Sequence, residues 1–238
     1  MKSKAMKTPL RFLEELAGLF YPNLCLACQQ QLPSRHSILC VHCQHQLPKT
    51  NYHIHAENPF TERFWGRVPL YAGTALYHFT KGGKVQHLIH SLKYEHKPDV
   101  GVCLGRLLGE QLRKSPLFSE VEIIVPVPLH PRKEWERGYN QSDCFARGLS
   151  EAMEIPWRKR GLLRSSNTAT QTKKSRIDRV VNVGAAFSIG EASRLSGRHV
   201  LLVDDVITTG ATLEACGLLL QQLPGLRLSM ATIAIADA

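Results

Sequence analysis

The segment 200–214, with the sequence V-L-L-V-D-D-V-I-T-T-G-A-T-L-E, constrains the fold of this chain more strongly than any other. Its first four residues form a short apolar run, which suits a strand that is buried on both faces of a sheet. Asp204 and Asp205 are expected to end this strand, and a helical composition resumes over residues 211–220. A buried strand, a small-residue turn and a helix in this order predict an α/β domain with a mostly parallel sheet flanked by helices.

The turn between this strand and this helix is a candidate phosphate-binding site. It contains Thr208, Thr209, Gly210, Ala211 and Thr212. A turn that leads into a helix exposes unpaired backbone N–H groups and the positive end of the helix dipole, and the threonine hydroxyls add further donors. The two aspartates before the turn suit a ribose diol or a hydrated Mg²⁺ ion, so a ribose 5′-phosphate fits the whole segment. The alternative is that the aspartates cap a sheet edge and the threonines cap the helix.

Four of the seven cysteines form two C-x-x-C pairs separated by eleven residues: Cys25, Cys28, Cys40 and Cys43. Each pair can turn two thiolates toward one ion, and four thiolates complete the tetrahedral shell of a structural Zn²⁺. The spacing therefore predicts a small zinc ribbon that is closed to catalysis and contacts a partner. Three histidines lie close enough in the sequence to compete as ligands: His36, His42 and His45. Disulfides or free thiols are the alternative.

The segment 200–214 resembles the 5-phosphoribosyl-1-diphosphate (PRPP) binding motif of type I phosphoribosyltransferases. The chain is also similar to the ComF/GntX family of predicted phosphoribosyltransferases, through L-K-Y at 92–94, R-G-Y-N-Q at 137–141 and the cysteine pairs. This resemblance implies a type I phosphoribosyltransferase fold. It also implies that Asp204 and Asp205 act as the catalytic pair, hold the ribose hydroxyls and order Mg²⁺, while the threonine turn binds the 5′-phosphate. Because several family members are tied to competence and DNA uptake, single-stranded DNA and competence proteins are the implied partners.

The same resemblance assigns two further groups of residues to PRPP. Arg132 and Lys133 follow a strand expected at 121–127, in the position of a loop that contacts the diphosphate. Three candidates for phosphate contacts lie in a stretch that we expect to form a mobile loop: Gln171, Arg176 and Arg179. That stretch, 158–179, contains eight basic residues and one acidic residue, and such a surface attracts a diphosphate or a nucleic-acid backbone alike. A solvated charged loop is the alternative.

Length and composition fit a globular protein of two domains. The 238 residues, 43% of them hydrophobic and 21% charged, suffice for one α/β core and a small appendage. We expect an N-terminal helix plus the zinc ribbon over 1–50, an irregular linker over 51–67 and the phosphoribosyltransferase-like domain over 68–238. Since no apolar run approaches the ~18 residues of a membrane span and no signal peptide is evident, we expect a cytoplasmic protein without membrane insertion.

Three functions are compatible with the sequence. The first is a Mg²⁺-dependent, PRPP-binding phosphoribosyltransferase-like protein that acts in DNA uptake or processing. The second is a non-catalytic module for which PRPP is a signal and which binds single-stranded DNA or a competence protein. The third is a nucleobase salvage phosphoribosyltransferase. No stretch of the sequence identifies the acceptor, because one fold supports many functions.

Overall fold

The computed structural model describes residues 23–33, 37–164 and 186–236 of the chain. Backbone contacts divide the chain into two compact units, Met1–Leu47 and Pro48–Ala238. In the first unit the described part consists of turns that contain Cys25 and Cys28, followed by helix α2 (Val41–Gln46). The N-terminal helix expected from the sequence lies outside the described residues.

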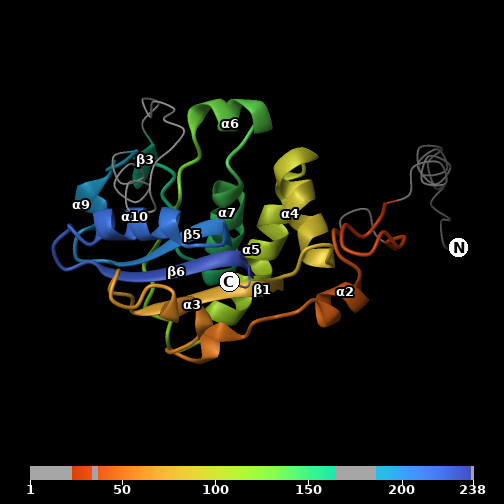
Figure 1. The fold of residues 1–238 in the computed structure, drawn as a ribbon, viewed down its shortest axis with the longest axis horizontal. Coiled ribbons are helices and arrows are strands. Elements are labelled where there is room, and N and C mark those ends of the chain that lie inside the picture. The colour runs from red at the N-terminus through yellow and green to blue at the C-terminus, as the bar shows by residue number, and fades with distance from the viewer. Residues whose placement is uncertain (1–22, 34–36, 165–185, 237–238) are drawn as a thin grey trace, which may run out of the picture. The chain divides into compact units, whose positions relative to one another are not determined.

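The second unit is built on a four-stranded sheet with the strand order β1-β6-β5-β2 (Figure 1). Its strands are β1 (Ala72–Phe79), β2 (Ile123–Pro126), β5 (His199–Ile207) and β6 (Arg227–Ala236). All three strand pairings are parallel, so the prediction of a mostly parallel sheet is confirmed. A separate antiparallel pair consists of β3 (Leu162–Arg164) and β4 (Phe187–Ile189).

Helices cover both faces of this sheet, with α10 on one face and α5 and α7 on the other (Figure 1). The helices and turns of the unit are η1 (Tyr52–Ile54), α3 (Pro59–Glu62), α4 (Lys84–Tyr94), α5 (Pro98–Leu112), α6 (Pro131–Arg137), α7 (Gln141–Met153), α9 (Ala192–Leu195) and α10 (Ala211–Leu220). Helices α5 and α7 touch backbone to backbone, because a Cβ atom on Gly105 would lie only 2.3 Å from the carbonyl oxygen of Phe145. This close contact fixes the start of α7, which leads into the site.

Strand β5 is longer than the sequence predicted, because Asp204 and Asp205 lie within it rather than at its end. The register pairs Asp204 with Thr232 and Val206 with Ala234 of β6. Aspartate is a poor strand former by itself, but pairing with a neighbouring strand overrides this weak preference. The two carboxylates are therefore mounted on the hydrogen-bonded sheet and not on a loop.

Residues 51–67, expected to be an irregular linker, are part of the folded second unit. They contain η1 and α3, and the side chain of Asn58 caps α3 by accepting hydrogen bonds from two of its backbone N–H groups. Pro59 starts this helix, a position that proline tolerates because its missing N–H would have no partner there. Phe60 and Phe64 are completely buried in the core of the sheet domain, so burial of these two rings determines the path of the segment.

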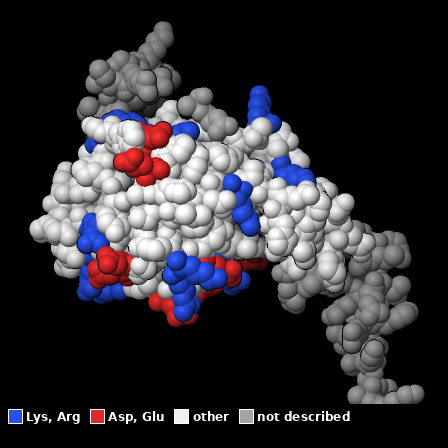
Figure 2. Space-filling model, turned by 90° about the horizontal axis from the view of Figure 1, so that it is seen from below, with Lys and Arg blue, Asp and Glu red and all other residues white. Residues whose placement is uncertain are grey.

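The net charge of +10 does not make a uniformly basic surface. Figure 2 shows a face on which basic and acidic side chains lie next to each other around a broad uncharged area. Exposed ion pairs such as Arg106–Glu151 and Arg113–Glu154, both at 2.6 Å, keep opposite charges together. Within the residues that the structure describes, none of the helices combines the length and the apolar character needed to cross a membrane.

Candidate functional site

The acidic pair lies near the carboxyl end of β5, where two helices contact it. The Ser142 hydroxyl on α7 donates to Asp204 Oδ1 at 2.9 Å, and the backbone N–H of Asp205 donates to the same oxygen at 2.9 Å. Lys93 Nζ on α4 lies 2.9 Å from Asp205 Oδ2. The sheet holds the two carboxylates in place, and two helices supply their partners.

The surroundings of Asp204 shift its protonation equilibrium. Removal of its carboxyl group from water and repulsion by Asp205 raise the pKa of Asp204 to about 7, although the hydrogen bonds from the Asp205 N–H and Ser142 and the charge of Lys93 act in the opposite direction. At neutral pH the carboxyl group therefore exists in both protonation states. A group with this property can accept or release a proton during a reaction.

An open hollow of about 50 Å³ follows the acidic pair. It is lined by Asp204 and residues 206–213. Gly210 is the N-cap of α10 and offers no side chain to cap it, so the first N–H groups of the helix and the positive end of its dipole face the hollow side of the turn. The hydroxyls of Thr208, Thr209 and Thr212 lie on the same lining. This combination of donors suits an anion.

Gly210 is required by both its conformation and its contacts. Its φ is +80°, and a Cβ atom there would lie 3.3 Å from the ring of Phe64. We therefore expect Gly210→Ala to lower the free energy of unfolding by about 1–3 kcal/mol, as measured by urea denaturation. Gly197→Ala is the matched control, because Gly197 has a φ of +72° and nothing within 4 Å of the added atom. Equal losses in the two variants would show that the Phe64 contact contributes nothing.

Arg63 belongs to the site, although no motif in the sequence pointed to it. Its guanidinium donates to the carbonyl oxygen of Thr208 in the turn and to that of Ala236 at the end of β6. Arg63 follows α3, in the segment that was expected to be a linker, and so the only local signal was the cap formed by Asn58 and Pro59. Lys93 and Ser142 were missed for the same reason, because they reach the acidic pair from distant elements.

Arg132 and Lys133, which were predicted to contact phosphate, do not line the hollow. The loop expected at Arg132 and Lys133 is instead helix α6, which starts at Pro131 with His130 as its N-cap. Arg132 is exposed and pairs with Glu136 through a 3.0 Å contact, four residues further along the same helix. Gln171, Arg176 and Arg179 lie outside the described residues.

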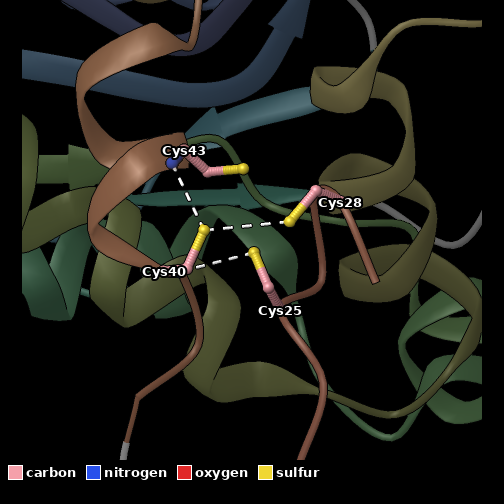
Figure 3. A group of neighbouring side chains, drawn as sticks. All are labelled: Cys25, Cys28, Cys40 and Cys43. Carbon is pink, nitrogen blue, oxygen red and sulfur yellow. Dashed lines mark hydrogen bonds between the residues drawn. The ribbon is translucent and has the colours of Figure 1, made fainter. Parts of the chain in front are cut away.

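The four predicted metal ligands converge in the first unit (Figure 3). The sulfur atoms of Cys25, Cys28, Cys40 and Cys43 all lie within 4.8 Å of one another. Cys28 Sγ and Cys40 Sγ are 3.8 Å apart, which is about the edge of a tetrahedron with metal–sulfur bonds of ~2.3 Å. None of the seven cysteines is in a disulfide. The cluster can hold a metal ion such as Zn²⁺.

Backbone N–H groups stabilise the thiolate form of one cysteine in this cluster, Cys25. Burial acts to raise the pKa of Cys25, but the N–H groups of Cys40, Cys28 and Ala27 outweigh it and lower that pKa to about 6. Burial and the neighbouring sulfur atoms raise the pKa of Cys43 instead. Among the described residues the cluster contains only cysteines. His36, one of the competing ligands considered above, lies outside those residues.

Comparison with known proteins places the chain among bacterial proteins with DNA-related names. No protein-family model matches it. It is 36% identical over 136 residues to DNA utilization protein YhgH of Escherichia coli K12, a match that covers 56% of this chain and 59% of that protein. It is 37% identical over 140 residues to competence protein F of Haemophilus influenzae, covering 57% of this chain and 61% of the relative. The matches thus span less than two thirds of either relative.

Similar solved structures are those of phosphoribosyltransferases. A glutamine PRPP amidotransferase from Bacillus subtilis aligns with a TM-score of 0.41 and 22% identity, over 59% of this chain and 30% of that one. Adenine phosphoribosyltransferase from Saccharomyces cerevisiae aligns with a TM-score of 0.37 and 17% identity, over 58% and 68% of the two chains. On the sequence matches, the chain is a homologue of bacterial proteins named for DNA utilization and competence.

Proposed function

We propose that this chain is a PRPP-binding, phosphoribosyltransferase-like protein of the ComF family that acts in DNA uptake or utilisation. One observation supports the ligand above all others: Asp204 and Asp205 are held on β5 directly before a threonine-lined hollow at the start of α10. In parallel α/β sheets, ligands bind at the carboxyl ends of the strands, which is where this hollow lies. The names of the relatives support the DNA-related role.

Each half of the hollow suits one part of PRPP. The threonine hydroxyls and the first N–H groups of α10 would bind the 5′-phosphate, because they are hydrogen-bond donors of residues that line one hollow. Asp204 and Asp205 would accept hydrogen bonds from the two ribose hydroxyls. The space that a Cβ atom of Gly210 would take lies against the ring of Phe64. Arg132, Lys133, Gln171, Arg176 and Arg179 stay candidates for contacts with the diphosphate.

Mg²⁺ fits the donor set of this site. Two carboxylates on one strand match the oxygen ligands that Mg²⁺ prefers, and a bound Mg²⁺ would neutralise charge on the departing diphosphate. Asp205 is already paired with Lys93, so Lys93 balances the charge of the pair in the free protein. In the first unit, the four thiolates would hold a structural Zn²⁺ that keeps a partner-binding module folded.

The raised pKa of Asp204 gives the site a testable pH dependence. In the unfolded chain this carboxyl group ionises near 3.9, whereas in the folded protein it keeps its proton until about pH 7. Its contribution to stability is therefore present at pH 4 and is lost as the pH rises toward 7. Affinity for the ribose hydroxyls should change in the opposite sense and rise through pH 7, since the ionised carboxylate is the better acceptor.

The variant Asp204→Asn tests this dependence. Asparagine can still accept the hydrogen bonds from Ser142 and the Asp205 N–H but carries no charge, so we expect the variant to be more stable than the wild type at pH 8. The gain in Tm should be about 2–4 °C for each kcal/mol recovered and should vanish near pH 4. A stability difference that is independent of pH, measured by calorimetry between pH 4 and 8, would contradict the assignment.

Calorimetry with PRPP and Mg²⁺ tests the proposed ligand directly. Heat from saturable binding to the folded protein is expected, and its absence would remove the proposal. Diphosphate release from PRPP, measured with a panel of nucleobase and amine acceptors, then separates an enzyme from a PRPP-binding regulator. Release with a nucleobase alone would instead favour a salvage enzyme.

A specific feature favours the second candidate function, in which PRPP binds without being cleaved. Asp204 is the ionisable residue in the lining of the hollow, and the other lining residues are threonines, glycine and apolar residues. The lining therefore contains no cationic side chain that could neutralise a departing diphosphate. If PRPP binds and no acceptor yields diphosphate, the non-catalytic function is the correct one.

A further inference from the structure

Arg63 connects the turn that lines the hollow to the neighbouring strand. One N–H group of its guanidinium donates to the carbonyl oxygen of Thr208 in that turn, and another donates to the carbonyl oxygen of Ala236, the last residue of β6. Strands β5 and β6 are paired as far as Ile207 and Ile235, so both carbonyl groups lie at the carboxyl edge of the sheet. A guanidinium presents its donors in a rigid planar fork. The two contacts therefore fix the turn relative to β6.

The contact with Thr208 also determines the direction of an N–H group in the turn. The peptide unit between Thr208 and Thr209 is planar and trans, so its carbonyl oxygen and its N–H group point to opposite sides. Because the carbonyl oxygen accepts from Arg63, the Thr209 N–H points away from Arg63. Among the described residues, neither this N–H group nor that of Gly210 donates to another backbone group. Both remain available to a ligand in the hollow that these residues line.

Arg63 is itself held in place by the residues around it in the chain. It is the C-cap of α3, the helix that Asn58 caps at its other end. Phe60 and Phe64, which precede and follow it, are completely buried. A Cβ atom on Gly210 would lie 3.3 Å from the Phe64 ring, so the backbone that carries Arg63 is anchored against the turn. Such preorganisation reduces the entropy that binding of a ligand costs.

Arg63 also places a positive charge beside a hollow whose lining has none. The lining consists of Asp204 and residues 206–213, which include no lysine or arginine. The charge of Arg67, four residues after Arg63, is balanced by Glu214 at 2.6 Å. The hydrogen-bond partners that the described residues offer to Arg63 are neutral carbonyl groups, which do not cancel its charge. Its field therefore favours an anion at the turn.

We propose that Arg63 is a positioning residue for a phosphate monoester in the hollow. It holds the Thr208 carbonyl group, leaves the Thr209 N–H available and contributes a positive charge, all without touching the ligand. The inference rests on the proposed function, because it takes the 5′-phosphate to lie at this turn. It adds that the affinity for this phosphate depends on a residue that lies outside the motif and 145 positions before Thr208 in the chain.

Ribose 5-phosphate is the probe that tests this role. It carries the phosphate and the ribose hydroxyls but lacks the diphosphate, so its binding can be measured without Mg²⁺. We expect titration calorimetry to show that Arg63→Ala weakens the Kd of ribose 5-phosphate about ten- to a hundredfold, the range expected for the loss of a hydrogen bond to a charged group. An unchanged Kd in this variant would overturn the inference.

Arg67→Ala is the matched control, because it removes a second arginine from the same segment. Arg67 pairs with Glu214, whose side chain is only 8% exposed, and its guanidinium lies 5.8 Å from the centre of the Phe64 ring. Its loss leaves a buried carboxylate without its partner, so Tm should fall at least as far as in Arg63→Ala. The Kd of ribose 5-phosphate should nevertheless stay at the wild-type value. Equal weakening in the two variants would indicate general destabilisation and would contradict the positioning role.

Phosphorus-31 NMR supplies a readout that a purely structural role would not change. The second pKa of a phosphate monoester is about 6 in water, and N–H donors and a nearby cation favour the dianion. The pKa of bound ribose 5-phosphate should therefore be lower in the wild type and in Arg67→Ala than in Arg63→Ala. Asp204 is present in all three proteins, so its own titration does not produce this difference. Equal pKa values of the bound phosphate in all three would count against Arg63.

Arg63→Lys separates the charge of Arg63 from its geometry. Lysine keeps the positive charge but lacks the planar fork that holds two carbonyl groups at once, so we expect it to bind ribose 5-phosphate nearly as weakly as Arg63→Ala does. Full recovery of affinity by lysine would show that charge alone matters and that Arg63 positions nothing.

The outcomes for Arg63 and for the proposed function can be told apart. If the wild type binds ribose 5-phosphate but not PRPP with Mg²⁺, the proposed ligand is wrong and the comparison of the arginine variants still stands. If the wild type binds PRPP and Arg63→Ala binds it equally well, only the role of Arg63 is wrong. If the wild type binds neither molecule, both are overturned.

Discussion

A chain in which Asp204 and Asp205 are both replaced by alanine is expected to lose PRPP binding while it keeps its fold. Each carboxylate would accept a charged hydrogen bond from the ribose, and such bonds contribute about 1.5–3 kcal/mol each. Their joint loss should weaken binding by about two to four orders of magnitude. The fold should persist, since the substitution removes a buried charge rather than an apolar contact. Titration calorimetry with PRPP and Mg²⁺ measures the effect.

Asp143→Asn is the matched control for this double variant. Asp143 is also a buried carboxylate, it follows Ser142 on α7, and burial raises its pKa as well. It contacts Lys159 and Asn140 and does not line the hollow. PRPP affinity should therefore stay close to that of the wild type. If the double alanine variant still bound PRPP, the assignment of the ribose to these aspartates would be mistaken.

The second large effect is expected at the cysteine cluster. Replacing Cys25 and Cys28 by serine should release the bound zinc and unfold the first unit, because so small a module has too little core to fold without its metal. Binding of structural zinc contributes about 10–16 kcal/mol in small zinc-binding peptides, so half a ligand set cannot retain it. Purified wild-type protein should contain one zinc per chain, as measured by atomic emission, and the variant none.

Cys103→Ser serves as the control for general effects of losing a thiol. Cys103 lies on α5 in the second unit and is not one of the four clustered cysteines. This variant should keep its zinc and its resistance to limited proteolysis. Equal zinc content in the wild type and in the variant of Cys25 and Cys28 would remove the metal assignment.

The parts of the fold that depend on local sequence were predictable. Residues 211–220 were expected to be helical and form α10 with these bounds, because turn residues before them and apolar residues within them act over short distances. The extension of β5 through Asp205 was not predictable, since it depends on pairing with β6. The burial of Phe60 and Phe64 was missed for a similar reason. Proline and polar residues in the segment indicated an irregular linker, and the residues that bury the two rings lie far along the chain.

The residues of the candidate site also fall into two groups, one predictable from local sequence and one that depends on distant contacts. Its central residues, from Asp204 to Thr212, are contiguous in the chain and could be recognised as one motif. Ser142, Lys93 and Arg63 reach the motif across 62 or more residues, and no periodicity in the sequence encodes such contacts. The sequence also suggested a loop at Arg132, where proline at a first helical position starts α6 instead.

The position of the acidic pair within β5 separates two tasks that a loop would have to perform together. Pairing with β6 fixes where the carboxylates are, so a ligand cannot pull them toward itself. Burial and their mutual repulsion raise the pKa of Asp204, and an ammonium group on α4 and a hydroxyl on α7 lower it from outside the sheet. Substitutions in those two helices should therefore retune the working pH of the site while leaving its geometry untouched.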